Sequence, residues 1–155
     1  MLYNDKSVNL THFIVRLCYV LLGAASVLLP IVLYKGLYEF EILGQIKSYI
    51  IGPFYAVVPA GYMALVCLDK LLINIKKEIV FETQNVKLLK IISIACFYAG
   101  MIGLISFIAV WLLDFMFETL LVLSMGEFFM ALVVRVVKNI FEKAIELKAE
   151  NDLTI

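Results

Sequence analysis

The sequence predicts an all-α integral membrane protein, a four-helix bundle with both termini in the cytoplasm. Two observations predict this fold class: four long apolar runs, and the gathering of lysine and arginine on alternate connections between them. Hydrophobic residues make up 64% of the chain and charged residues 17%. A soluble domain typically has about 45–50% apolar and about 25% charged residues. The 155 residues therefore leave room for one transmembrane domain, residues 1–155, and no separate extramembrane domain.

The four runs cover residues 13–34, 50–68, 91–113 and 115–137. The hydrocarbon layer of a bilayer is about 30 Å thick and a helix rises about 1.5 Å per residue, so about 20 apolar residues cross it. Lipid offers no hydrogen bonds to backbone groups, so each run must form a helix.

The orientation follows from the cations. If the N-terminus is cytoplasmic, all of the 13 lysine and arginine residues except Lys35 and Lys47 lie on the cytoplasmic side or at that edge of the spans. Short loops of membrane proteins keep lysine and arginine inside the cell. This distribution predicts that both termini are cytoplasmic. The formal net charge of zero gives no indication of direct nucleic-acid binding.

The inner connection, residues 69–90, is the longest polar stretch. Its apolar residues recur at helical spacing: Leu71, Leu72, Ile75, Ile79 and Val80. This pattern predicts that the second helix continues as an amphipathic helix near the cytoplasmic surface of the membrane. Thr83 is the expected cap of the third helix.

The fourth helix is predicted to continue beyond the membrane as a cytoplasmic helix over residues 138–151. It carries an apolar stripe made of Val137, Ile140, Phe141, Ala144 and Ile145.

Small residues recur every four positions in two of the runs. They are Ala56, Ala60 and Ala64 in the second run, and Ala95, Ala99 and Gly103 in the third. Such ridges let helix backbones approach closely in lipid, so we expect the second and third helices to pack along them. The alternative is a face for dimerisation, which would make the protein a homo-oligomer.

Glu127 falls at the middle of the fourth run. An ionisable group at that depth costs about 2.5 kcal/mol or more and usually faces the interior of a bundle. Glu127 is therefore a candidate proton or substrate carrier, or else a neutral hydrogen-bonding link between helices. Arg135 and Arg16 lie at the inner edge of the fourth and first spans, and are expected to reach for lipid phosphate or to contribute to an inner polar layer.

Residues for catalysis or metal binding are missing from the sequence. His12 is the single histidine, and Cys18, Cys67 and Cys96 have no CxxC spacing. Motifs of hydrolases, nucleotide-binding proteins and zinc proteases are absent. We therefore expect no enzymatic activity, no catalytic residue, no metal site and no cofactor.

Two parts of the sequence resemble the DUF2975 family, small four-helix bacterial membrane proteins of uncharacterised function. The first comprises residues 68–72 (LDKLL), 80–82 (VFE) and 85–90 (NVKLLK); the second comprises residues 126–129 (GEFF), 133–137 (VVRVV), Phe141, Ala144 and 150–155 (ENDLTI). Members are often encoded beside a very small helix-turn-helix regulator. The resemblance thus implies a bacterial plasma membrane location and a small DNA-binding partner, and it supplies no catalytic residues.

The leading hypothesis is a docking or sequestering partner for a cytoplasmic protein, because patterned polar sequence is concentrated on the inner side. The surface that would contact a protein or lipid headgroups comprises Lys70, Lys76, Lys77, Phe81, Asn85, Lys87, Phe141, Ile145, Leu153 and Ile155. A binding surface for protein and a surface that rests on anionic lipid both fit this pattern. Two alternatives remain: a small oligomeric transporter or ion pathway that uses Glu127, and an immunity protein against a membrane-active peptide.

Overall fold

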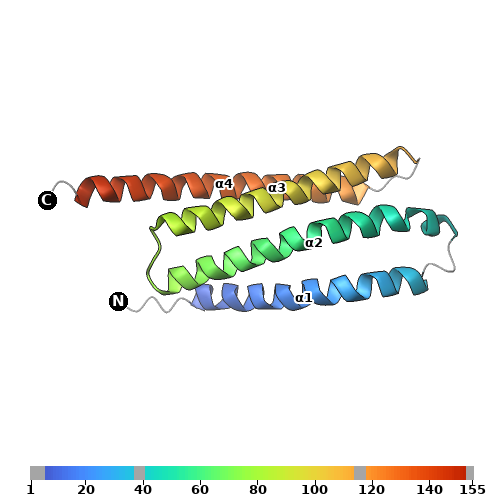
Figure 1. Ribbon diagram of the computed structural model, residues 1–155, viewed down its shortest axis with the longest axis horizontal. Coiled ribbons are helices and arrows are strands. Elements are labelled where there is room, and N and C mark those ends of the chain that lie inside the picture. The colour runs from blue at the N-terminus through green and yellow to red at the C-terminus, as the bar shows by residue number, and fades with distance from the viewer. Residues whose placement is uncertain (1–5, 37–40, 114–117, 153–155) are drawn as a thin grey trace.

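The computed structural model describes residues 6–36, 41–113 and 118–152, and these form four long helices (Figure 1). The helices are α1 (Lys6–Gly36), α2 (Glu41–Lys76), α3 (Thr83–Trp111) and α4 (Glu118–Asp152). All four are long and apolar enough to cross a membrane. The all-α, four-helix prediction is confirmed; the predicted start of the fourth run, residues 115–117, lies outside the described residues.

The helices form an open row. Across the part of the chain that the structure describes, α1 contacts α2, α2 contacts α3 and α3 contacts α4, with no other helix pair in contact. Figure 1 shows this succession, with α1 and α4 on opposite sides of the row. Lipid can cover the faces that a soluble bundle would have to close, so the row needs no contact between its first and last helices.

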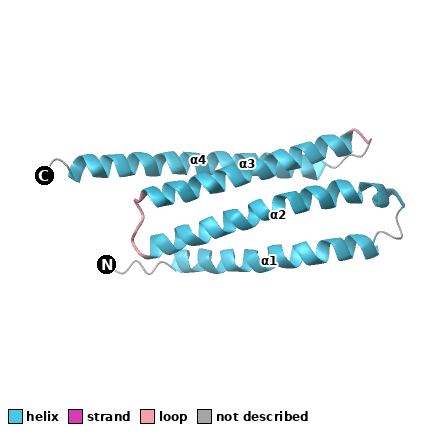
Figure 2. Ribbon diagram, viewed as in Figure 1, coloured by secondary structure: helices cyan, strands magenta, loops and turns pink. Residues whose placement is uncertain are grey.

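The start of α1, the loop between α2 and α3, and the end of α4 lie at the same end of the molecule (Figure 2). We call this end the turn end. The predicted helical extension of the second run is present and ends at Lys76, and the predicted extension of the fourth run continues through Asp152. From Thr83 onward the polar connection already belongs to α3, so only residues 77–82 link the two helices.

Two details of this connection differ from expectation. The N-cap of α3 is Glu82, whose side chain makes no capping hydrogen bond, and Thr83 is already inside the helix. Part of the apolar face of the α2 extension packs against α3. Leu71 and Leu72 are buried, and Leu71 packs in one cluster with Leu88 and Leu89 of α3. The facing apolar residues of α3 give Leu71 a protein partner, whereas Ile79 at the end of the stripe remains 37% exposed.

The small-residue ridges are only partly used as predicted. Ala60 of α2 and Ala95 of α3 are buried, while Ala56 is exposed. Gly103 faces α4: a Cβ there would lie 2.5 Å from the Ser124 hydroxyl oxygen. Each step of four residues turns about 40° around a helix, so a ridge that starts toward α2 has turned toward α4 eight residues later.

Candidate functional site

The turn end begins with a tight turn after α2. Glu78 has φ of 60°, its N–H donates to the Ile75 carbonyl at 3.0 Å, and the Ile79 N–H donates to the Asn74 carbonyl at 3.0 Å. These two bonds make a Schellman motif, which satisfies carbonyls at the end of a helix. Glycine usually fills its left-handed position because a side chain disfavours that backbone conformation. Here an exposed glutamate fills it.

Asn85 holds this turn from inside. Its side chain is 0% exposed, and its Nδ2 donates to the carbonyls of Ile79 and Val80, each at 2.7 Å. Its Oδ1 accepts a bond of 2.7 Å from Nδ2 of Asn74 on α2. A buried amide with both ends bonded fixes the loop against both helices. Asn85 therefore cannot belong to a partner surface, and this prediction is wrong.

An aromatic contact joins the turn to α4. The Phe81 and Phe141 rings lie 5.9 Å apart between centroids, and Phe81 remains 50% exposed. Phe141 also packs against the buried cluster, whose members are Cys67, Leu71, Leu88, Leu89 and Ile92. The turn end is thus a packed unit of three helices, and Phe81 is its exposed apolar tip.

Beside this unit, a groove of about 410 Å³ runs between the start of α3 and the last part of α4. Its lining residues are Thr83, Val86, Lys87, Lys90, Glu142, Ile145 and Glu146. The two lysines come from α3 and the two glutamates from α4, with Val86 and Ile145 as apolar residues of the lining. The groove therefore presents cations on one wall and carboxylates on the other.

A second hollow lies near the middle of the row. It has a volume of about 560 Å³ and is lined by all four helices, with Glu127 as the residue from α4. A neighbouring cavity of about 270 Å³ between α2, α3 and α4 is also lined by Glu127, together with Ser106 and Ser124. Cys96 of α3 lines the larger hollow together with Glu127. Glu127 faces the interior, as its mid-span position predicted.

The α3–α4 pair is the most closely fitted contact in the row. Oγ of Ser93 donates to the Ala131 carbonyl at 2.8 Å, and the Phe97 and Phe128 rings meet edge to face at 5.3 Å. A Cβ on Gly100 would lie 3.1 Å from the Phe128 ring. Backbone approach of this kind depends on small residues.

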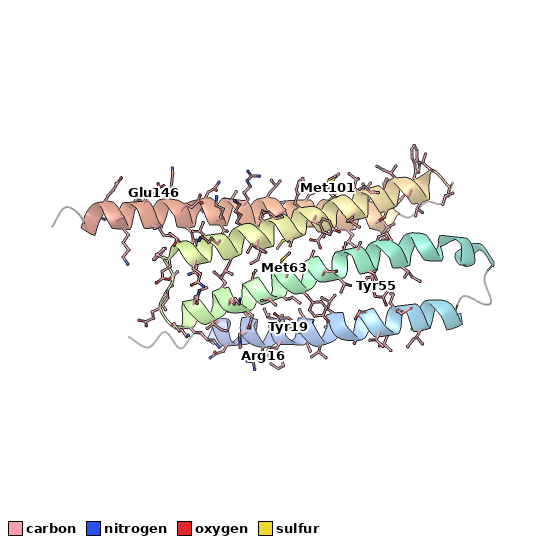
Figure 3. All side chains as sticks on the ribbon, in the orientation of Figure 1. Arg16, Tyr19, Tyr55, Met63, Met101 and Glu146 are labelled. Atoms are coloured by element: carbon pink, nitrogen blue, oxygen red, sulfur yellow. The ribbon has the colours of Figure 1, made fainter. Side chains whose placement is uncertain are left out.

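The α1–α2 pair has fewer specific contacts. Nε2 of His12 lies 2.9 Å from an Asp69 carboxylate oxygen at the turn end. Farther along the helices, the Tyr55 hydroxyl donates to the Ser26 carbonyl at 2.5 Å, and Figure 3 shows Tyr55 between the two helices. Sequence reasoning did not pair His12 with Asp69, although both lie at the same edge of their predicted spans.

The other predicted site residues separate into distinct places. Arg16 and Arg135 are exposed on α1 and α4, which are not in contact, so they do not form a shared inner layer; Figure 3 shows Arg16 pointing away from α2. Lys70, Lys76 and Lys77 are exposed on α2 and the residue that follows it, away from the groove, whereas Lys87 and Ile145 line it. Leu153 and Ile155 lie outside the described residues.

Ala64 and Ala99 do not close the contact between α2 and α3. Both line the larger hollow instead, so these small residues create space beside Glu127. Two residues that sequence reasoning missed, Asn74 and Ser124, are single polar residues within helical patterns. The available signals are an asparagine two residues before the end of a helix and a serine one turn before the mid-span glutamate.

Comparison with family models finds one match, described as a protein of unknown function (DUF2975), over residues 39–155. This range includes all of α2, α3 and α4, and it begins after the end of α1. Curated proteins and solved structures gave no match to the chain.

Proposed function

The chain belongs to the DUF2975 family, and we propose that this multi-pass membrane protein docks a cytoplasmic protein at its turn end. The proposed location is the bacterial plasma membrane, with the turn end inside the cell. The cations support this orientation. The turn end carries Lys70, Lys76, Lys77, Lys87 and Lys90, and membrane proteins keep such residues on the cytoplasmic side.

The groove between α3 and α4 is the observation that carries the proposal. Its lysine wall, its glutamate wall and its apolar residues Val86 and Ile145 complement a helix with one apolar stripe, acidic residues on one flank and basic residues on the other. None of Lys87, Lys90 and Glu146 forms an ion pair within the part of the chain that the structure describes. Their charges are available to a partner.

The occupant that we propose is an amphipathic helix of a small cytoplasmic regulator, for which a helix-turn-helix protein is the candidate. Capture at the membrane would keep such a regulator from its DNA. Charge complementarity contributes to the choice of partner and to the association rate.

Lipid headgroups suit a different part of the turn end. Lys70, Lys76 and Lys77 are exposed cations, and each cation close to an anionic membrane surface contributes about 1 kcal/mol of attraction. In the groove, Glu142 and Glu146 offset the attraction of Lys87 and Lys90 for anionic lipid. We therefore assign protein binding to the groove, and contact with lipid headgroups to Lys70, Lys76 and Lys77.

Site-specific photo-crosslinking in intact cells tests the proposal. A photoreactive amino acid at position 145 should crosslink to a soluble cytoplasmic protein, which mass spectrometry of the adduct identifies. The charge reversals Lys87→Glu and Lys90→Glu together should reduce that adduct about tenfold, because two attractive contacts become repulsive.

Lys143→Glu is the matched control, because Lys143 is exposed on α4 and does not line the groove. It should leave the adduct unchanged. Crosslinks from position 145 to lipid alone, or an adduct that survives the double reversal at full yield, would rule out the groove as a protein-docking site.

A further inference from the structure

The larger hollow in the middle of the row has the chemistry of a ligand site. We propose that it binds a lipophilic cation, with the Glu127 carboxylate as counter-ion. The proposal is independent of docking at the turn end, because it concerns different residues at a different depth. Its foundation is the combination of space, apolar walls and one acidic group.

The space is large enough for a small molecule. About 560 Å³ lies within the range of about 300–1,000 Å³ that is usual for small-molecule sites. The walls are almost wholly apolar: beside Glu127, the lining consists of aliphatic side chains, Gly61 and two thiols, Cys18 and Cys96. Such walls fit hydrocarbon or aromatic groups and offer no water to a ligand.

The single acidic group determines the sign of the charge that the ligand carries. No lysine, arginine or histidine lines either cavity, and Glu127 is in no ion pair among the described residues. The titratable groups that face it are Cys96 from α3 and Cys18 from α1; α2 contributes none. A carboxylate inside a membrane is costly without a partner of opposite charge. A bound cation would supply that partner.

The neighbouring cavity contains a buried hydroxyl group without a hydrogen-bond partner among the described residues. Ser124 is 1% exposed, and its hydroxyl oxygen has no hydrogen-bond partner within the described chain. The two cavities share Val57, Ala99 and Glu127, so Ser124 lines the cavity next to the larger hollow, and Glu127 lines both. A buried oxygen of this kind offers an additional acceptor beside the carboxylate.

A hydrated metal ion is a poor occupant. Calcium and similar ions need six or more oxygen ligands, and the larger hollow offers only one carboxylate. No group of three or more histidine, cysteine or acidic residues that could hold a metal ion occurs in the part of the chain that the structure describes. An organic cation needs only the counter-charge and apolar contact.

The open arrangement of the four helices gives a ligand access to the hollow from the lipid. The hollow is not enclosed, and α1 and α4, which contribute Cys18 and Glu127, do not contact each other within the described ranges. A lipophilic cation dissolved in the membrane can therefore enter sideways without crossing water.

Equilibrium binding to the full chain in phosphatidylcholine nanodiscs tests the proposal, with tetraphenylphosphonium as the probe. Wild-type protein should bind it saturably above the background of empty nanodiscs. Tetraphenylborate, which has the same shape and the opposite charge, should not bind saturably. Saturable binding of both ions with equal affinity, or of neither, would overturn the assignment.

Three variants locate the site. Glu127→Gln should weaken tetraphenylphosphonium binding about thirtyfold or more, because it removes one partner of a desolvated charge pair. Ala99→Leu places a larger side chain in the wall that the two cavities share, so it should also weaken tetraphenylphosphonium binding. Glu118→Gln alters an exposed carboxyl group on the same helix, outside both cavities, and should leave the affinity unchanged.

Wild-type affinity in Glu127→Gln would refute the role of the carboxylate. Circular dichroism should show that the variants keep their helices. If Glu127→Gln does not fold, the proposal is tested by the affinity of Ala99→Leu for tetraphenylphosphonium and by the selectivity of wild-type protein for the cation over the anion. Equal binding by Ala99→Leu would then place the cation elsewhere.

Discussion

The contacts of α3 and those of α1 differ sharply. α3 is held on two sides: by α4 through Ser93, Gly100 and Gly103, and by α2 through the buried cluster at the turn end. Among the described residues, α1 contacts only α2, and most of its apolar side chains there are exposed. In lipid, close packing and hydrogen bonds hold helices together, because burial of apolar surface gives little extra stability there. The helices α2 to α4 therefore form one stable unit to which α1 is added.

This division coincides with the range of the family match. Residues 39–155 begin after α1, which ends at Gly36. Both the groove and most of the residues around Glu127 lie within the matched range, while α1 supplies one wall of the larger hollow. Three sets of substitutions test whether stability is divided in the same way.

The largest effect is expected at Asn85. Asn85→Ala would leave the carbonyls of Ile79 and Val80 and the Asn74 amide without their bonds inside a packed region. A buried polar group without a partner costs about 1–3 kcal/mol, so we expect a loss of about 3 kcal/mol in the free energy of unfolding. Denaturant unfolding in micelles, followed by circular dichroism, measures it. Asn139→Ala on the exposed side of α4 is the control and should be nearly neutral.

A smaller loss is expected where α3 approaches α4. Gly100→Ala places a Cβ 3.1 Å from the Phe128 ring, so the ring or the helix must move. The cost is about 1–2 kcal/mol. Gly126→Ala on α4 meets nothing within 4 Å and should be neutral or stabilising by up to about 1 kcal/mol, since alanine favours helix. Thermal unfolding of the two variants should therefore shift in opposite directions or by clearly different amounts; equal shifts would contradict the close α3–α4 contact.

The smallest effect is expected between α1 and α2. The His12–Asp69 pair is partly exposed at the turn end, where such pairs contribute about 0.2–1 kcal/mol. A double-mutant cycle of His12→Ala and Asp69→Ala should give a coupling energy in that range. A coupling above the loss caused by Asn85→Ala would show that α1 is held as firmly as the other helices.

The sequence predicts the four helices well because lipid forces long apolar runs into helices. Periodicity also predicts that α2 and α4 continue past their apolar runs, since the apolar positions keep a helical spacing. The residue roles at the turn end are less predictable. Asn85 lies between Gln84 and Val86, within the polar inner connection, and nothing local distinguishes it from a surface residue. Its burial depends on the left-handed turn at Glu78, which directs two carbonyl groups toward it.

The partners of small residues are equally hard to infer from one helix alone. The ridge from Ala95 to Gly103 was assigned to α2, but rotation along the helix brings its outer end to α4. The depth of Glu127 could be predicted from its position in the run. The hollow beside it could not, because its volume depends on how far apart four backbones lie.

A row in which every contact joins consecutive helices has a consequence for biosynthesis. Each helix finds its complete set of protein neighbours as soon as the next helix has been made, and no early segment has to wait for the last one. Assembly can then proceed from the ribosome outward, one hairpin at a time, with little entropy lost to closing long loops. The protein would be expected to tolerate slow translation better than a membrane protein of equal size whose ends must meet.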